Sequence, residues 1–427
     1  MIIQFSFKNY KSFRDEVTLD MTATKMTELN NHVANIGNDK LLKIAAICGA
    51  NASGKSNIYD AFEYMSHYVH ESFNFGGDSE SKPRDKKRYP EVTPFLFDVN
   101  VKDEPTSFEV FFIDNQDSMQ KTYQYGFSLL HNSVEEEWLY VKTRSARSYR
   151  TIFYRKRGEK TDFTGISKGA ENIELSLQKE SLIVSLGAKL KINLLKKVRD
   201  WFFKNEVVDF GDPIENLIRS QTLPFNFEDN REVQKQVIKY FSTFDESIKD
   251  FRVKVESATS TEEDDKITIE ALHKNNRGEL ISIPLQKESN GTLKMFALYP
   301  PVQQVMENGS TLFVDELNAR LHPLLVRNII LSFANPEINR NNAQLIFTTH
   351  DAWLLSNDIL RRDEIWFVDK DVETGVSDLY SLADFSDDNG NKIRKDEAYS
   401  KNYLLGKYGA IPHLKSLDVL EGDKYGE

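Results

Sequence analysis

Residues 49–56 read GANASGKS, a glycine-rich octapeptide that ends in Gly-Lys-Ser. This spacing matches G-x-x-x-x-G-K-[ST], in which the glycines allow successive backbone N–H groups to face phosphate oxygens. Lys55 is expected to reach the β- and γ-phosphates of a nucleotide, and the Ser56 hydroxyl is expected to ligate Mg²⁺. The chemistry that this segment predicts is the binding of ATP with Mg²⁺.

Two further segments end in side chains that suit the same reaction. Residues 311–316 read TLFVDE, an apolar run that ends in two acids. We expect Asp315 to hold the Mg²⁺ through water and Glu316 to polarise the attacking water. The run QLIFTTH ends in His350, which could hydrogen-bond the γ-phosphate and sense its presence. The predicted catalytic residues are therefore Glu316, His350 and Lys55.

These residues need a scaffold that brings distant segments together, and the chain supplies one. The apolar run at 44–48 predicts a buried parallel strand, and apolar residues recur at helical spacing from Ser56 onward. The last third alternates helix and strand, which is typical of a parallel sheet. The predicted elements there are a helix from about 290, strand 311–315, helix 321–334 and strand 344–348.

The middle of the chain has a different pattern. Short aromatic and β-branched segments in 93–155 predict an antiparallel meander, and 170–205 reads as helical. Strands resume near 251–256 and 266–273. We therefore predict three parts: an N-terminal lobe at 1–165, a helical insert at 166–245 and a C-terminal lobe at 246–427.

Composition limits the class of protein. The chain has 427 residues, 40% of them apolar, with one cysteine (Cys48), and it lacks an apolar run of about 18 residues. These features predict a globular, cytoplasmic protein. The net charge of −11 argues against a dedicated nucleic-acid binder. The basic strip 142–160 could bind nucleic acid or an acidic partner, although the solvated edge of a hairpin is the favoured interpretation.

The order GANASGKS, ESNGT, TLFVDE, FTTH resembles an ABC-type ATPase head of the SMC/RecF/OLD class. The resemblance implies an α/β fold with a mixed central sheet, an antiparallel β-subdomain and a helical insert subdomain. It also implies a head-to-tail dimer, in which the ESNGT turn of one chain contacts the ATP of the other. The nucleotide-binding residues that follow are Gly49, Ala50, Asn51, Ala52, Ser53, Gly54, Lys55, Ser56, Asn57, Ser289, Asn290 and Gly291.

Three details of the resemblance concern the surroundings of the nucleotide. The opening FKNYKSF resembles a first strand and turn whose residues near Lys11, Ser12 and Arg14 approach the nucleotide, and LNARLHP resembles a D-loop at the dimer seam. The glutamine of the Q-loop stays unassigned among Gln116, Gln120 and Gln124. His322 is expected at a helix start or at the seam rather than on a metal.

A narrower resemblance spans nearly the whole chain. NYKSF, TPFLFD, YQYGF, DELNARLHP, DEIWFVDKD and YLLGKYGAIP resemble the abortive-infection ATPases of the RloA/AbiLi kind. That family implies a partner encoded alongside, often a TOPRIM-like nuclease, and protection of bacteria against phage. Two alternatives stay open: a RecF-like repair ATPase acting directly on DNA, and a scaffold that binds ATP structurally. The acidic charge argues against the first, and the intact Glu316 against the second.

Overall fold

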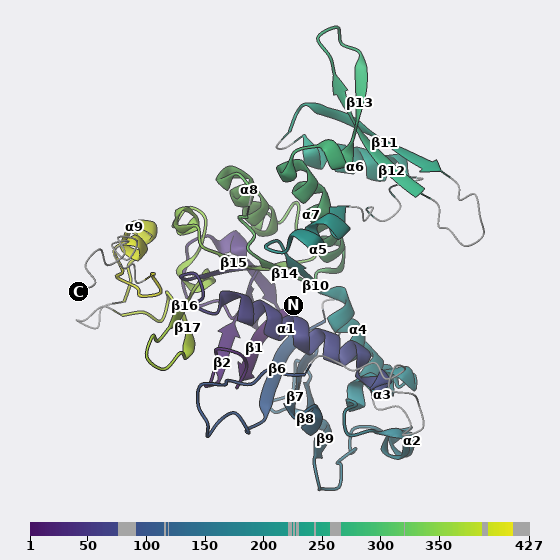
Figure 1. Ribbon diagram of the computed structural model, residues 1–427. Helices are drawn as coiled ribbons and strands as arrows, with labels where there is room; N and C mark the ends of the chain where they lie inside the picture. The colour runs from purple at the N-terminus through teal and green to yellow at the C-terminus, as the bar shows by residue number, and fades with distance from the viewer. Residues whose placement is uncertain are drawn as a thin grey trace, which may run out of the picture.

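The computed structural model contains two large sheets with one helix between them and a smaller sheet that projects from one end (Figure 1). The structure describes residues 1–75, 91–114, 117, 119–220, 224, 227, 230–242, 245–256, 266–319, 321–386 and 392–412. The charged stretches 78–88 and 259–265, Gln116 and Arg320 lie outside these residues.

The central sheet has six strands in the order β10-β14-β15-β5-β16-β17. Neighbouring strands are parallel except β16 and β17, so the sheet is mixed. Every residue of β5, β14 and β15 is buried, which explains the apolar runs IAAIC, LFV and LIF at their centres. The bounds are β10 Glu206–Asp209, β14 Thr311–Asp315, β15 Gln344–Thr349, β5 Ile44–Cys48, β16 Ile365–Lys370 and β17 Ser377–Ser381.

The second sheet is antiparallel, with the order β2-β1-β6-β7-β8-β9, and contains the predicted meander. Helix α1 (Lys55–Glu71) packs between the two sheets. Its Phe62 ring lies 5.3 Å from that of Phe5 in the antiparallel sheet and 5.9 Å from that of Phe313 in the central sheet. The strands are β1 Ile2–Lys8, β2 Val17–Asp20, β6 Thr106–Ile113, β7 Thr122–Leu130, β8 Ser133–Lys142 and β9 Arg150–Lys156.

In the part of 166–245 that the structure describes, the predicted helical insert has five helices and one strand. Strand β10 lies within it and pairs with β14, because the β-branched pair at 207–208 fits a buried strand position. Helix α4 buries Leu195, Val198, Trp201 and Phe202, while Leu194 is half-buried. The helices are α2 Ala170–Ser176, α3 Ile183–Lys189, α4 Asn193–Lys204, α5 Pro213–Ser220 and α6 Arg231–Phe241.

The third sheet, β11-β12-β13, projects away from the two larger ones and leads into α7 (Asn290–Asn308) (Figure 1). Helix α8 (Pro323–Ala334) packs against the face of the central sheet that α1 leaves uncovered. The remaining elements are β3 Val33–Ile36, β4 Asp39–Leu42, β11 Ile248–Glu256, β12 Lys266–Lys274, β13 Leu280–Pro284 and α9 Tyr399–Leu404.

The strand order brings the candidate residues together. Strand β15 lies between β5 and β14, and all three run in the same direction. Their carboxyl ends, and with them the glycine-rich loop, His350 and Asp315, therefore meet at one edge of the sheet. This arrangement confirms the predicted α/β fold with a mixed central sheet and a separate antiparallel sheet. Among the described residues, no helix combines the length and apolar character that a membrane crossing requires.

Candidate nucleotide-binding site

The loop between β5 and α1 depends on its glycines. Ala52 and Gly54 have φ angles of 61° and 111°, in the left-handed region. A Cβ atom on Gly49 would lie 2.4 Å from the carbonyl oxygen of Val368, and one on Gly54 would lie 2.7 Å from Ser12 Oγ. Glycine is thus required at both positions for steric reasons.

Lys55 points back into this loop. Its Nζ donates to the carbonyl oxygens of Gly49 and Ala50 at 2.9 and 2.8 Å. Burial lowers the pKa of Lys55, while the negative charges of Asp315 and Glu316 oppose that shift. The amine therefore lies at the centre of the loop, where phosphate oxygens would replace the two carbonyls as its partners.

A buried serine cluster holds the loop in place. Ser377 on β17 donates through Oγ to the carbonyl oxygen of Ser53 at 2.6 Å and lies 2.8 Å from Ser12 Oγ. Asn57 Nδ2 donates to the same Ser12 Oγ at 2.8 Å. Ser12 and Asn57, two predicted nucleotide contacts, thus share a hydrogen bond beside the loop. Lys11, a third, forms an ion pair with Asp60 on α1.

The two acids at the end of β14, Asp315 and Glu316, are held by a threonine on the neighbouring strand β15. Thr348 Oγ1 donates to Asp315 Oδ1 and accepts a hydrogen bond from the Glu316 backbone N–H at 2.9 Å. Asp315 is 4% exposed. Glu316 has a φ angle of 51°, a left-handed conformation that is unfavourable for glutamate. The strand therefore ends at Asp315, and Glu316 begins the turn that follows it.

His350 follows β15, between the glycine-rich loop and the two acids. Thr349 Oγ1 donates to Asn318 Oδ1 at 3.0 Å, so the amide nitrogen of Asn318 faces His350 Nε2 at 3.3 Å. In the tautomer that lets Nε2 accept from this amide, the Nδ1–H is the donor that a phosphate oxygen would use.

Asp209 lies at the end of β10 and was not predicted from the sequence. It pairs in register with Asp315, and its Oδ1 accepts from the backbone of Gly211 at 2.6 Å and of Asp212 at 3.2 Å. Burial, together with the nearby Asp315, raises the pKa of Asp209. A Cβ on Gly211 would lie 3.4 Å from Glu316 Oε2, so this turn reaches the acidic pair. The signal was present, because an apolar run ends in an acid at Asp209 just as it does at Asp315.

The Q-loop candidates lie elsewhere. Gln124 is on β7 and donates to Glu109 at 2.8 Å, and Gln120 lies in the turn before that strand. Gln124 therefore belongs to the antiparallel sheet. The strand beside β14 whose end lies in register with Asp315 is β10.

The candidate ligands fit Mg²⁺ only together with a nucleotide. Within the described residues, no group of three or more His, Cys, Asp and Glu side chains could hold a metal by itself. Mg²⁺ prefers oxygen ligands and commonly combines one or two protein groups with phosphate oxygens. The Ser56 hydroxyl at the start of α1 and the Asp315 carboxylate provide oxygens of that kind.

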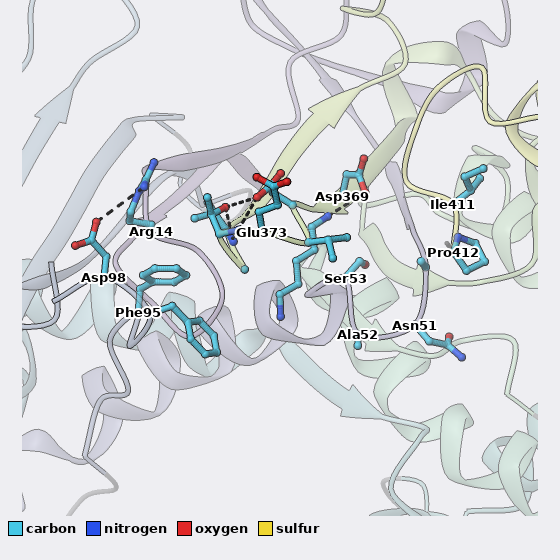
Figure 2. Close-up of a pocket in the computed structure, with 18 of the residues that line it drawn as sticks. Arg14, Asn51, Ala52, Ser53, Phe95, Asp98, Asp369, Glu373, Ile411 and Pro412 are labelled. Carbon is cyan, nitrogen blue, oxygen red and sulfur yellow. Dashed lines mark hydrogen bonds and ion pairs between the residues drawn. The ribbon is translucent and has the colours of Figure 1, made fainter. Parts of the chain in front are cut away.

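A cavity of about 960 Å³ adjoins the glycine-rich loop (Figure 2). Residues 50–53 line one side of it, and Arg14 lines it through its exposed guanidinium, which pairs with Asp15. Of the three residues predicted in the N-terminal turn, Arg14 alone lines this cavity. The YLLGKYGAIP segment reaches it through Ile411 and Pro412.

The ESNGT turn lies at the start of α7. Ser289 caps this helix by accepting from the Thr292 N–H at 3.1 Å, and both Ser289 and Asn290 are exposed. The turn does not contribute to the lining of the cavity beside the loop. Lys294 on the same helix donates to the carbonyl oxygen of Ala319 in the LNARLHP segment, and its Nζ lies 4.1 Å from the ring centroid of Phe210.

Two secondary predictions can be compared with the structure. In the basic strip, Arg155 donates to the Ser181 carbonyl oxygen, while Lys156 and Arg157 pair with Glu136 and Glu135. These contacts match the favoured interpretation, the edge of a hairpin. His322 is the N-cap of α8, and its Nδ1 accepts from the Leu324 N–H, so it stands at a helix start as expected.

Comparison with known proteins identifies the family. The profile described as "AAA domain, putative AbiEii toxin, Type IV TA system" matches residues 44–356, about three quarters of the chain. The chain belongs to this AAA family. The matched range includes the glycine-rich loop, the ESNGT turn, both acids and His350. No curated protein sequence matches the AAA-family chain.

Among solved structures, the AAA-family chain is similar to "Crystal structure of the SmcHead bound to the C-winged helix domain of ScpA". The two share 14% sequence identity, with a TM-score of 0.43, and the match covers 89% of this chain and 97% of that chain.

Proposed function

We propose that the protein binds ATP with Mg²⁺ and hydrolyses it to ADP and phosphate. The observation that carries this proposal is the meeting of the Gly49–Ser56 loop, the Asp315–Glu316 pair and His350 at one edge of the central sheet. Each group comes from a different strand end, and each has a separate part in phosphoryl transfer.

The loop and α1 would hold the triphosphate. Backbone N–H groups of the loop and the positive end of the helix dipole attract the phosphates, and Lys55 neutralises charge at the β- and γ-positions. Mg²⁺ bound with Ser56 and Asp315 would supply further positive charge to the phosphate oxygens. Glu316 would accept hydrogen bonds from the attacking water and orient it, while the Nδ1–H of His350 would donate to the γ-phosphate.

Two substitutions test the proposal. Lys55→Ala should abolish ATP binding, because the loop then loses its central cation. Glu316→Gln should bind ATP but hydrolyse it at least about 10²-fold more slowly, since an amide cannot act as a base. Equilibrium dialysis measures ATP binding by Lys55→Ala, and phosphate release measures hydrolysis by Glu316→Gln. Normal turnover by Glu316→Gln would remove Glu316 from the mechanism.

We further propose that ATP closes a head-to-tail dimer. The N-terminal turn of α7 is exposed and does not line the cavity of its own chain, which supports a contact with a second copy. Three charge-assisted hydrogen bonds from this turn to a γ-phosphate would contribute about 4.5–9 kcal/mol per site. A difference of about 5.5 kcal/mol moves an equilibrium from 1:99 to 99:1. The γ-phosphate could therefore switch the dimer.

Asn290→Asp tests this contact. The substitution keeps the side-chain size at an exposed helix start but places a negative charge against the γ-phosphate of the other chain. We expect the isolated chain to bind ATP normally, while ATP-dependent dimerisation in a Glu316→Gln background is lost. Sedimentation velocity with ATP or ADP measures it. An unchanged ATP-dependent dimer would contradict the head-to-tail arrangement.

We propose, finally, that the ATPase belongs to an antiphage abortive-infection system and that its nucleotide state controls an effector, such as a TOPRIM-like nuclease. The RloA/AbiLi resemblance and the toxin–antitoxin description of the family support this. Co-expression with the product of the adjacent gene, followed by purification with and without ATP, tests the partnership. Phage plating on cells that carry the wild-type pair or the Lys55→Ala pair tests the protection, and equal plating efficiency would refute it.

A further inference from the structure

The cavity beside the glycine-rich loop extends well beyond the phosphate-binding residues. Its other walls come from Phe95 and residues 97–99, from residues 369–376 at the end of β16 and in the turn that follows it, and from residues 411–412 (Figure 2). The volume of about 960 Å³ lies within the range of about 300–1,000 Å³ that is usual for small-molecule sites. In the proposed function, the glycine-rich loop, the two acids and His350 bind the phosphates of the nucleotide. The rest of the cavity has no ligand group assigned to it.

Phe97 gives the cavity a planar apolar surface. The side chain is 73% exposed, although its neighbour Phe95 is 1% exposed and belongs to the interior. The Phe97 ring meets the Phe95 ring edge-on at a centroid distance of 5.6 Å, and it lies close enough to Gly375 that a Cβ there would be 3.2 Å from it. An exposed aromatic ring of this kind suits the stacking of a second flat ring.

Polar groups surround this ring. Lys370 Nζ lies 5.9 Å from the Phe97 centroid, and Arg14 lies 4.0 Å from the Asp98 carboxylate. Asp98 and Asp369 both line the cavity, and their carboxylates can accept hydrogen bonds from hydroxyl groups. The cavity thus combines one flat apolar face with acceptors for a polyhydroxylated ring.

We propose that this cavity binds the nucleoside half of the nucleotide, with the base stacked on Phe97 and the ribose hydroxyls facing the carboxylates. The inference rests on the proposed function, because the phosphates of the same molecule occupy the loop at 50–53. It also assigns a role to the YLLGKYGAIP segment, whose last two residues, Ile411 and Pro412, form the wall at the end of the cavity opposite Phe95 (Figure 2).

The experiment compares two probes, ATP and inorganic tripolyphosphate, by calorimetric titration of the full chain with Mg²⁺. Loss of one stacked base weakens binding by about 5- to 150-fold. Phe97→Ala should therefore weaken ATP binding by such a factor and leave tripolyphosphate binding unchanged. Leu96→Ala is the matched control, because Leu96 is 63% exposed and adjacent in sequence but does not line the cavity.

The outcomes separate the two proposals. Equal ATP affinity of Phe97→Ala and Leu96→Ala overturns the nucleoside site and leaves the phosphate site intact. Equal weakening of ATP and tripolyphosphate by Phe97→Ala also overturns it, because Phe97 would then act through the shape of the loop. Retention of ATP binding by Lys55→Ala instead refutes the proposed function.

Discussion

Thr348 is the residue through which the structure makes its sharpest prediction. One hydroxyl on β15 donates to the Asp315 carboxylate and accepts from the Glu316 N–H, although Thr348 itself has no part in the proposed chemistry. Thr348→Val keeps the size and the β-branch of a side chain that is 0% exposed. The substitution removes both hydrogen bonds and little else.

The structure sets the size of the effect. A hydrogen bond to a buried carboxylate is worth about 1.5–3 kcal/mol, and a buried N–H left without a partner costs about 1–3 kcal/mol. The two terms share one hydroxyl, so we expect a loss of about 2–4 kcal/mol in the free energy of unfolding. Glu316 also loses the contact that holds its φ of 51°, and we expect at least about a 10-fold fall in kcat.

Urea unfolding and steady-state phosphate release measure the two effects. Thr311→Val is the control, since Thr311 is also 0% exposed but stands at the opposite end of β14, with one hydroxyl contact to Gln344 at 3.3 Å. The control should lose little stability and keep its turnover. Full activity of Thr348→Val, or an equal loss of activity in both variants, would refute the role of Thr348 in positioning the acids.

Three further predictions concern other parts of the molecule. Gly54→Ala should weaken ATP binding at least about 10-fold in a titration, because Gly54 has a φ of 111° and no room for a Cβ. Burial lowers the pKa of His70 from 6.5 to about 4. Between these two pH values the unfolded chain binds a proton at His70 and the native state does not. Native stability is thus complete above about pH 6.5 and falls towards pH 4. Between pH 7.5 and 5 the wild type should lose about 2 kcal/mol in the free energy of unfolding through His70, as measured by urea unfolding. His70→Phe keeps the stacking on Phe203 and should not show this loss. Lys294→Met removes the amine that donates to the Ala319 carbonyl oxygen. We expect lower ATP turnover with unchanged ATP affinity. Unchanged turnover would show that this contact does not matter for hydrolysis.

The sequence by itself determined the parts of the protein that depend on local spacing. The glycine positions in GANASGKS follow from backbone conformations that other residues cannot adopt, and the unbroken apolar runs follow from complete burial in a parallel sheet. Strands β5, β14 and β15, the acids at 315–316 and His350 were therefore placed correctly along the chain, and the fold class followed from their order.

Only the tertiary structure decided which distant segments meet. Asp209 reaches Asp315 because β10 joins the edge of the central sheet, and Ser377 supports the loop across more than three hundred residues of chain. Phe97 and the segment at 411–412 face one cavity for the same reason. A local pattern specifies the conformation of a segment, whereas strand pairing and side-chain packing between segments far apart depend on the free energy of the whole fold.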